Sequence, residues 1–180
     1  MRIFLTAVVV ILFLILAGAG YLLWGGYNVA ANVPDRKITQ WFLEIVRERS
    51  IELHSQGLSV PPLKDVKLAE IGFPHYHAMC RLCHDAPGYQ AEEFARGLNP
   101  QPPHLASREV QELKDRELYW VVRNGIKMTG MPAFAPTHTE KEILGLVAFL
   151  RLLPELTPEK YRSNLKAAGI REEGPSPHHR

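Results

Sequence analysis

Residues 80–84 read CRLCH, the pattern C-x-x-C-H, and this stretch decides which fold we expect. Two thiols three positions apart at the end of a helix can bond the two vinyl-derived carbons of one porphyrin, and the adjoining histidine then projects its imidazole toward the iron. The pattern therefore indicates covalent haem attachment outside the cytoplasm, through Cys80 and Cys83, with His84 as the proximal iron ligand. A covalently attached haem cannot dissociate, however small the core around it.

Three other interpretations of CRLCH stay open at this point. A redox pair of the thioredoxin type needs a βαβ context, which the sequence does not show. Half of a zinc site needs a second pair of ligands, and among the other histidines only His75 and His77 come near such a spacing. The pattern can also be a coincidence of two inert cysteines.

A second iron ligand is expected downstream, where residues 125–134 read GIKMTGMPAF. A methionine thioether favours ferrous iron and raises the reduction potential relative to two imidazoles. Met131 is the better candidate because Pro132 stiffens the backbone beside it. Met128 is the alternative.

The N-terminal segment is apolar and carries no charge from Ile3 to Trp24. As a helix it would be roughly 33 Å long, enough to cross a hydrocarbon core. Tyr21, Trp24 and Tyr27 lie where aromatic rings favour the membrane–water interface. A cleaved signal peptide is the alternative, but its apolar region is normally shorter. We therefore expect residues 1–26 to be a retained transmembrane anchor.

A juxtamembrane helix over about residues 35–54 is indicated by apolar residues at helical spacing. These residues are Ile38, Trp41, Phe42, Ile45 and Val46. Their stripe can lie in the lipid headgroup layer, dock onto a partner or pack on its own domain, and we favour the last. Residues 57–62, GLSVPP, then form a linker, so that residues 27–63 join the anchor to the next domain.

The C-terminal tail, residues 155–180, is polar, with a short helix expected around 158–168. Residues 171–180, REEGPSPHHR, have the composition of a disordered end, and His178 and His179 need no ligand role there.

Composition excludes several classes of protein. The 180 residues include 21 Lys and Arg against 19 Asp and Glu, and this near balance argues against a nucleic-acid binder. Two cysteines cannot form a disulfide scaffold or a four-thiolate zinc or iron–sulfur site.

Residues 64–154 resemble the class I c-type cytochromes, which are small single-haem electron carriers. In that family a helix with the pattern G-x-x-x-Y-x-x-x-C leads into the haem motif, and Gly72, Tyr76 and Cys80 match it. The family's Pro-x-Leu is similar to residues 103–105, and its distal Gly-Met-Pro-Ala to residues 130–133. The resemblance implies an all-α class I cytochrome c fold, with helices wrapped around one covalently bound haem.

The resemblance also implies particular contacts. The carbonyl of Pro103 would accept a hydrogen bond from His84 Nδ1, with Pro102 as a near competitor, and would orient the imidazole. The first and last helices would cross at Gly72, with Phe149 beside them. The haem pocket would be lined by Tyr76, Leu105, Tyr119, Val122 and Phe134.

Two local features bear on the ends of these helices. Thr139 and Glu142 form a capping box that opens the last helix, which runs to Pro154. Pro74 implies that the first helix begins close to Gly72 or bends there.

The function implied is one-electron transfer by a monohaem cytochrome c of the bacterial inner membrane, single-pass, with its haem domain in the periplasm. Charge alone does not give this orientation, because Arg2 and the free N-terminal amine on one side nearly balance Arg36 and Lys37 on the other. The expected cofactor is one haem c and the expected partners are redox proteins, with no catalysis, nucleic acid or small-molecule substrate. Arg81 and Lys127 could steer an acidic partner.

Two alternatives to a free carrier stay open: a permanent subunit of a membrane redox enzyme complex, and a haem protein that binds a ligand at an open iron position.

Overall fold

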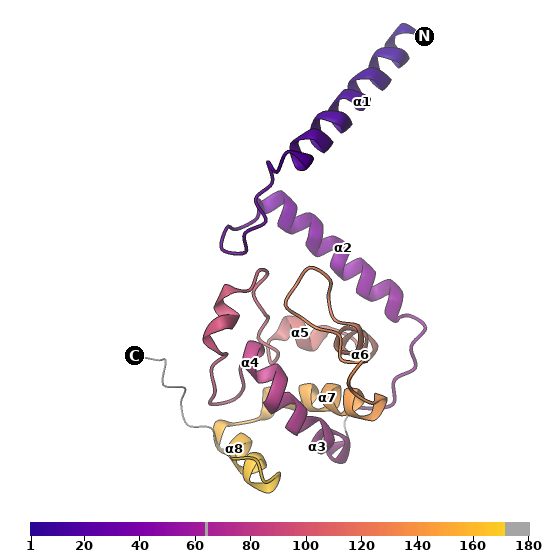
Figure 1. Ribbon diagram of the computed structural model, residues 1–180. Coiled ribbons are helices and arrows are strands. Elements are labelled where there is room, and N and C mark those ends of the chain that lie inside the picture. Colours follow the sequence, from indigo (N-terminus) through magenta and orange to yellow (C-terminus); the bar gives the residue numbers. More distant parts are fainter. Residues whose placement is uncertain (64, 172–180) are drawn as a thin grey trace. The chain divides into compact units, whose positions relative to one another are not determined.

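The computed structural model describes residues 1–63 and 65–171 (Figure 1). The chain divides into two compact units, Met1–Pro34 and Asp35–Arg180. Every regular element among the described residues is a helix, and no strand occurs in these ranges. The prediction of an all-α protein is confirmed. His178 and His179, and the disorder expected around them, lie outside the described residues.

The first unit contains helix α1, Arg2–Leu23, which buries none of its residues. By length and composition this helix can cross a membrane, although a signal sequence passes the same test. Near its C-terminal end, the Tyr21 hydroxyl donates a hydrogen bond to the carbonyl of Gly26, and Gly25, just beyond the helix, adopts a positive φ of 80°. These contacts end the helix in a tight turn.

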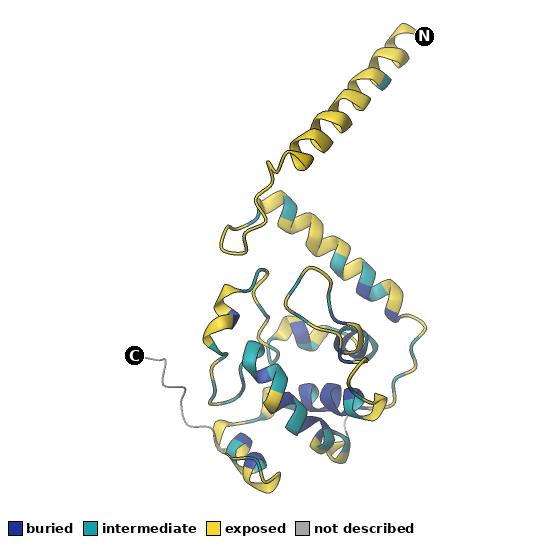
Figure 2. Ribbon diagram, in the orientation of Figure 1, coloured by how far each residue is buried: buried dark blue, intermediate teal, exposed yellow. Residues whose placement is uncertain are grey.

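The second unit begins with helix α2, Lys37–Ser55, close to the predicted 35–54. Only its C-terminal half packs on the domain, where Ile51 and Ser55 are buried and the His54 ring lies 5.9 Å from Trp120 of α6, Asp115–Asn124. The expectation that the apolar stripe packs on its own domain is wrong. All five of its residues are exposed: Ile38, Trp41, Phe42, Ile45 and Val46. Figure 2 shows that α2 is mostly exposed at its start and buried only near its end.

The core forms where α3, Val66–His75, crosses α7, Glu140–Leu152. The crossing is too close for side chains, because a Cβ on Gly145 would lie 2.8 Å from Gly72 N and 2.9 Å from Leu68 O. Beside it, the Phe149 ring lies 4.9 Å from Tyr76. The predicted crossing at Gly72, with Phe149 next to it, is confirmed.

Pro74 does not start the first helix, which already begins at Val66 with Asp65 as its N-cap. Proline removes one backbone donor and displaces the carbonyl four residues earlier. Helix α3 nevertheless runs through Pro74 to His75. A π-helical turn follows, η1 (Tyr76–Cys80), and then α4 (Arg81–His84). Helical structure therefore continues to His84.

The remaining elements are short helices joined by loops. They are η2 (Glu93–Gly97), α5 (Arg108–Glu112), η3 (Leu153–Glu155) and α8 (Pro158–Ala167). The Thr139–Glu142 capping box opens α7 as predicted. The helix predicted around 158–168 is confirmed as α8, but it is more than a polar tail. Its Tyr161 and Leu165 are fully buried, and Tyr161 Oη lies 3.0 Å from His77 Nδ1.

We expect Gly145→Ala to lower the free energy of unfolding by about 1–3 kcal/mol, because the added methyl group would overpack the helix crossing. Urea unfolding of the full chain measures this. Gly57→Ala is the matched control, since no atom lies within 4 Å of a Cβ placed there, and it should change the value by less than about 0.5 kcal/mol. Equal effects of the two substitutions would contradict a close crossing.

Candidate functional site

Cys80 and Cys83 lie at the junction of η1 and α4, and both are free, half-buried thiols. Burial, reinforced by the neighbouring Cys83, raises the pKa of the Cys80 thiol to about 12. Burial also raises the pKa of Cys83. Redox-active C-x-x-C pairs need the opposite, a lowered pKa that makes a thiolate. The electrostatics therefore speak against a thioredoxin-type pair.

His84 ends α4, and its Nδ1 lies 2.8 Å from the carbonyl oxygen of Pro103. A carbonyl only accepts, so Nδ1 carries the proton and donates it, which leaves the lone pair on Nε2. Burial lowers the pKa of His84, while the bond to Pro103 and the charge of Asp85 act in the opposite direction. A lowered pKa favours the neutral imidazole, the form that coordinates a metal.

Asp85 follows His84 in a strained backbone conformation, with φ 60° and ψ −173°. This region is populated almost only by glycine. Two contacts surround the residue: the Tyr76 hydroxyl donates to its carbonyl oxygen at 2.8 Å, and its Oδ1 lies 3.0 Å from His104 Nδ1. The His104 contact and the His84–Pro103 bond together join residues 84–85 to residues 103–104 at two points.

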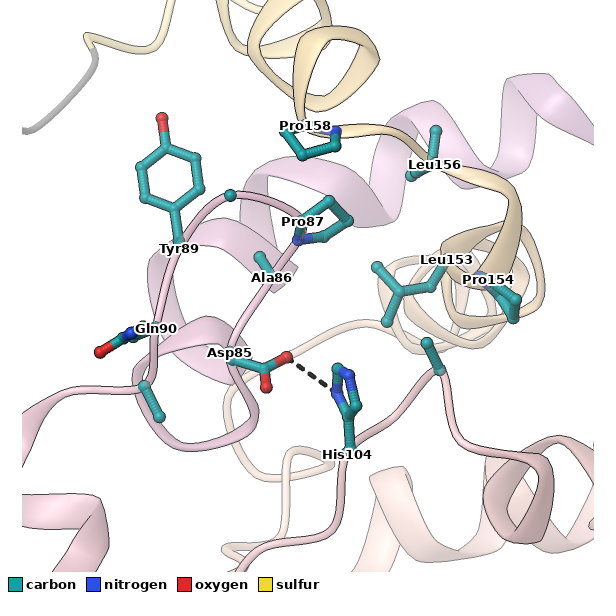
Figure 3. Close-up of a pocket in the computed structure, with 13 residues that line it drawn as sticks. Asp85, Ala86, Pro87, Tyr89, Gln90, His104, Leu153, Pro154, Leu156 and Pro158 are labelled. Atoms are coloured by element: carbon teal, nitrogen blue, oxygen red, sulfur yellow. Dashed lines mark ion pairs between the residues drawn. The ribbon is translucent and has the colours of Figure 1, made fainter.

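Asp85 and His104 line a groove of about 680 Å³. Figure 3 draws the side chains around it and marks the contact between these two residues. Three segments form its walls: the turn 85–91, His104 with Ala106, and the loop from Leu153 to Pro158. Burial raises the pKa of Asp85, and the charges of His104 and His84 oppose that rise. The groove thus places a carboxylate and an imidazole next to the segment that carries His84.

The two candidate methionines differ sharply in environment. Met131 is half-buried against the core, whereas Met128 is 92% exposed with a positive φ of 59°. Hydrogen bonds hold the Met131 backbone at both ends: its N–H donates to Thr129 Oγ1 at 3.1 Å, and its carbonyl accepts from the Ile126 N–H at 3.1 Å. The loop fixes Met131 and turns Met128 toward solvent.

Gly125 closes the base of the same loop. Its φ is 66°, and a Cβ there would lie 2.6 Å from the carbonyl carbon of Pro132. The backbone of residues 125–132 therefore needs glycine at this position.

The residues predicted to line a pocket lie in and around the core. Tyr76, Tyr119, Val122 and Phe134 are buried, and Leu105 is half-buried against them. The Tyr119 hydroxyl accepts from Arg123 Nη1 at 3.0 Å and lies 3.4 Å from Glu140 Oε1. Its polar end thus faces α7 and the surface, while its ring belongs to the core.

Arg81 is not the surface charge that the sequence led us to expect. It is 6% exposed, its Nη1 lies 3.2 Å from Glu92 Oε1, and its guanidinium lies 5.5 Å from the centre of the Tyr89 ring. A buried, paired cation of this kind holds the loop after α4 and cannot meet a partner at the surface. Lys127 is exposed.

Sequence reasoning missed Asp85, His104 and Thr129. No motif marks these residues, because their importance comes from contacts that form only once the loops close. The zinc alternative gains no support: across residues 1–63 and 65–171, no three His, Cys, Asp or Glu side chains form a group that could hold a metal ion. His75 instead faces Glu142 of α7 at 3.5 Å.

The domain is helical, C-x-x-C-H ends one of its helices, and the histidine of that motif is hydrogen-bonded to a backbone carbonyl. These features are typical of the c-type cytochromes. The comparison of families agrees: a model described as cytochrome c oxidase, cbb3-type, subunit III matches residues 67–150. This part of the chain is a c-type cytochrome domain of the class I fold, and such a domain holds covalently bound haem c. No curated protein matches the chain.

The residues present fit that cofactor. Two free thiols stand three positions apart beside an imidazole whose Nε2 takes no part in the Pro103 bond. A half-buried thioether, Met131, is available as a second donor. This donor set is one that a six-coordinate haem iron uses.

We expect Asp85→Gly to be more stable than Asp85→Ala by about 1–3 kcal/mol, since glycine relieves the positive φ and alanine does not. Both substitutions remove the carboxylate, so the comparison isolates the backbone. Urea unfolding of the two full-length variants measures it. An alanine variant as stable as the glycine variant would contradict the strain assigned to Asp85.

Proposed function

We propose that the chain is a membrane-anchored monohaem cytochrome c that carries single electrons between respiratory or dehydrogenase partners. The observation that carries this proposal is the hydrogen bond from His84 Nδ1 to the Pro103 carbonyl, next to the half-buried thiols of Cys80 and Cys83. An imidazole held in this way presents Nε2 in a fixed direction, and the hydrogen bond at Nδ1 makes Nε2 a stronger ligand.

Each residue of the site has a distinct role in the proposal. Cys80 and Cys83 would hold haem c through thioether bonds, and His84 Nε2 would coordinate its iron. Met131 Sδ would be the second ligand, and the 92% exposure of Met128 supports this choice. When bound, the haem supplies a one-electron Fe(III)/Fe(II) couple. With both axial positions taken by side chains, the chain leaves no position for a substrate, so the protein would be a carrier and not an enzyme.

The core around the site would exclude water from the cofactor. Tyr76, Val122 and Phe134 are buried, and Leu105 is partly buried against the core to which they belong. Apolar surroundings of this kind lower the local dielectric and tune the reduction potential. The same residues form the protein core. A bound haem would add apolar surface to this core, which a domain of this size could hardly complete without it.

The proposed location is the bacterial inner membrane, crossed once by α1. The length and apolar composition of Arg2–Leu23 support this anchor. Haem attachment to C-x-x-C-H takes place outside the cytoplasm, so the haem domain would face the periplasm. Tethering would raise the effective concentration of membrane-bound redox partners.

We expect Met131→Leu to abolish the long-wavelength charge-transfer absorption of oxidised iron–methionine coordination and to lower the reduction potential by on the order of 0.1 V. Optical spectra and redox titration of the full chain measure both effects. Met128→Leu is the matched control, because the same atoms change on an exposed side chain.

Loss of the band in Met128→Leu with retention in Met131→Leu would reverse the assignment. Carbon monoxide binding by the unsubstituted protein at neutral pH would instead support an open iron position, and with it the ligand-binding alternative.

A second candidate function is a permanent subunit of a membrane redox complex. The description of the matching family, which names a subunit of a cbb3-type oxidase, favours it. The haem site would work in the same way, but electrons would pass within one assembly.

Purification from the native membrane in mild detergent separates these two candidates. A free carrier should elute at the size of the chain with its detergent micelle. Stable co-elution with other haem-containing or redox subunits at constant stoichiometry would show a complex and would contradict the carrier.

A further inference from the structure

The N-terminal half of α2 carries an apolar surface that is left exposed by the part of the second unit that the structure describes. Ile38, Trp41, Phe42 and Ile45 form this surface, which we call the outer stripe. The exposed fraction of these residues runs from 38% for Ile45 to 65% for Ile38. We propose that the outer stripe lies in the lipid–water interface of the membrane that α1 crosses, so that α2 is a second membrane contact.

Helix geometry places the outer stripe on the free side of α2. With 3.6 residues per turn, its four residues recur every three or four positions and share one side. The side that contacts the domain is opposite, where Ile51 and Ser55 are buried and His54 faces Trp120. Figure 2 shows the change along α2, from exposed in its first half to buried near its end. Closer packing on α6 therefore cannot cover the stripe.

The chemistry of the stripe matches a lipid interface. Trp41 and Phe42 are bulky and apolar, and tryptophan in particular is enriched at the membrane–water boundary. Between Ile38 and Ile45 the only charged residue is Glu44. This side chain lies on the domain side, where its Oε1 is 3.4 Å from Arg47 Nη2. No charge has to leave water when the stripe enters the interface.

Cations stand at both ends of the stripe. Lys37 precedes it, and Arg49, one turn beyond Ile45, is 77% exposed and forms an ion pair with Glu52 at 3.0 Å. Long cationic side chains can lay their stems on an apolar surface and place their charges among phosphate headgroups. An apolar stretch with cations at its two ends is the pattern of a helix lying in that layer.

The short connection between α1 and α2 favours lipid over a protein partner as the group that covers the outer stripe. Residues 24–36 join α1 to α2, and even fully extended they span no more than about 50 Å. The stripe is therefore permanently confined near the bilayer, where lipid is present at far higher local concentration than any partner. The inference rests on the anchor in the proposed function, and the experiment separates the two.

Spin labels on the full chain in nanodiscs of phosphatidylcholine and phosphatidylglycerol test the proposal. Phe42→Cys puts a label in the outer stripe. Gln40→Cys is the matched control, two residues away on the domain-facing side and also exposed. Power saturation compares access by oxygen, which concentrates in lipid, with access by a water-soluble nickel chelate. The unsubstituted chain, labelled in parallel, corrects for any reaction at Cys80 and Cys83.

We expect the oxygen-to-nickel accessibility ratio to be several-fold higher at position 42 than at position 40. Equal ratios at the two positions would overturn the proposal, since the stripe would then face water. Shielding of position 42 from both reagents would also overturn it, because a second copy of the chain would then cover the stripe. A chain that nanodiscs do not retain would contradict the anchor itself, and this proposal with it.

Discussion

The hydrogen bond between His84 Nδ1 and the Pro103 carbonyl, 2.8 Å long, is the contact on which the rest of the site depends. It fixes the tautomer of the imidazole and the direction of Nε2, and it brings together two segments far apart in the chain. The Asp85–His104 pair and the Tyr76 hydroxyl close the same loop beside it. One of these contacts holds the His84 ring and the other two hold Asp85, whose backbone is strained.

The helix crossing determines where that ring stands. Gly72 and Gly145 let α3 and α7 approach until backbone meets backbone, and Phe149 then packs against Tyr76. The π turn after α3 carries the chain onward to Cys80, and α4 continues it to His84 without a break. From the other side, α8 inserts Tyr161 against His77. The segment that carries the two thiols is therefore held by the α3–α7 crossing and by α8, a helix that lies outside the residues matched by the family model.

Much of this could be predicted because it is encoded locally. Thr139 and Glu142 stand at capping-box spacing, and the Gly72, Tyr76 and Cys80 spacing marks the first helix. Other features depend on contacts that spacing does not contain. Apolar periodicity at Trp41 and Phe42 predicts a helix, but it does not predict whether another part of the protein buries the apolar side of that helix. The burial of Arg81 depends on its ion pair with Glu92, which lies beyond a loop. The exposure of Met128 goes with the positive φ of its backbone.

X-ray absorption at the iron edge of the purified full-length protein tests the central claim most directly, because it reads the iron ligands without any substitution. Coordination by His84 and Met131 predicts five nitrogen neighbours and one sulfur neighbour in both oxidation states. An iron with six nitrogen or oxygen neighbours, or a five-coordinate iron without sulfur, would contradict the claim that this chain holds its haem with His84 on one side and Met131 on the other.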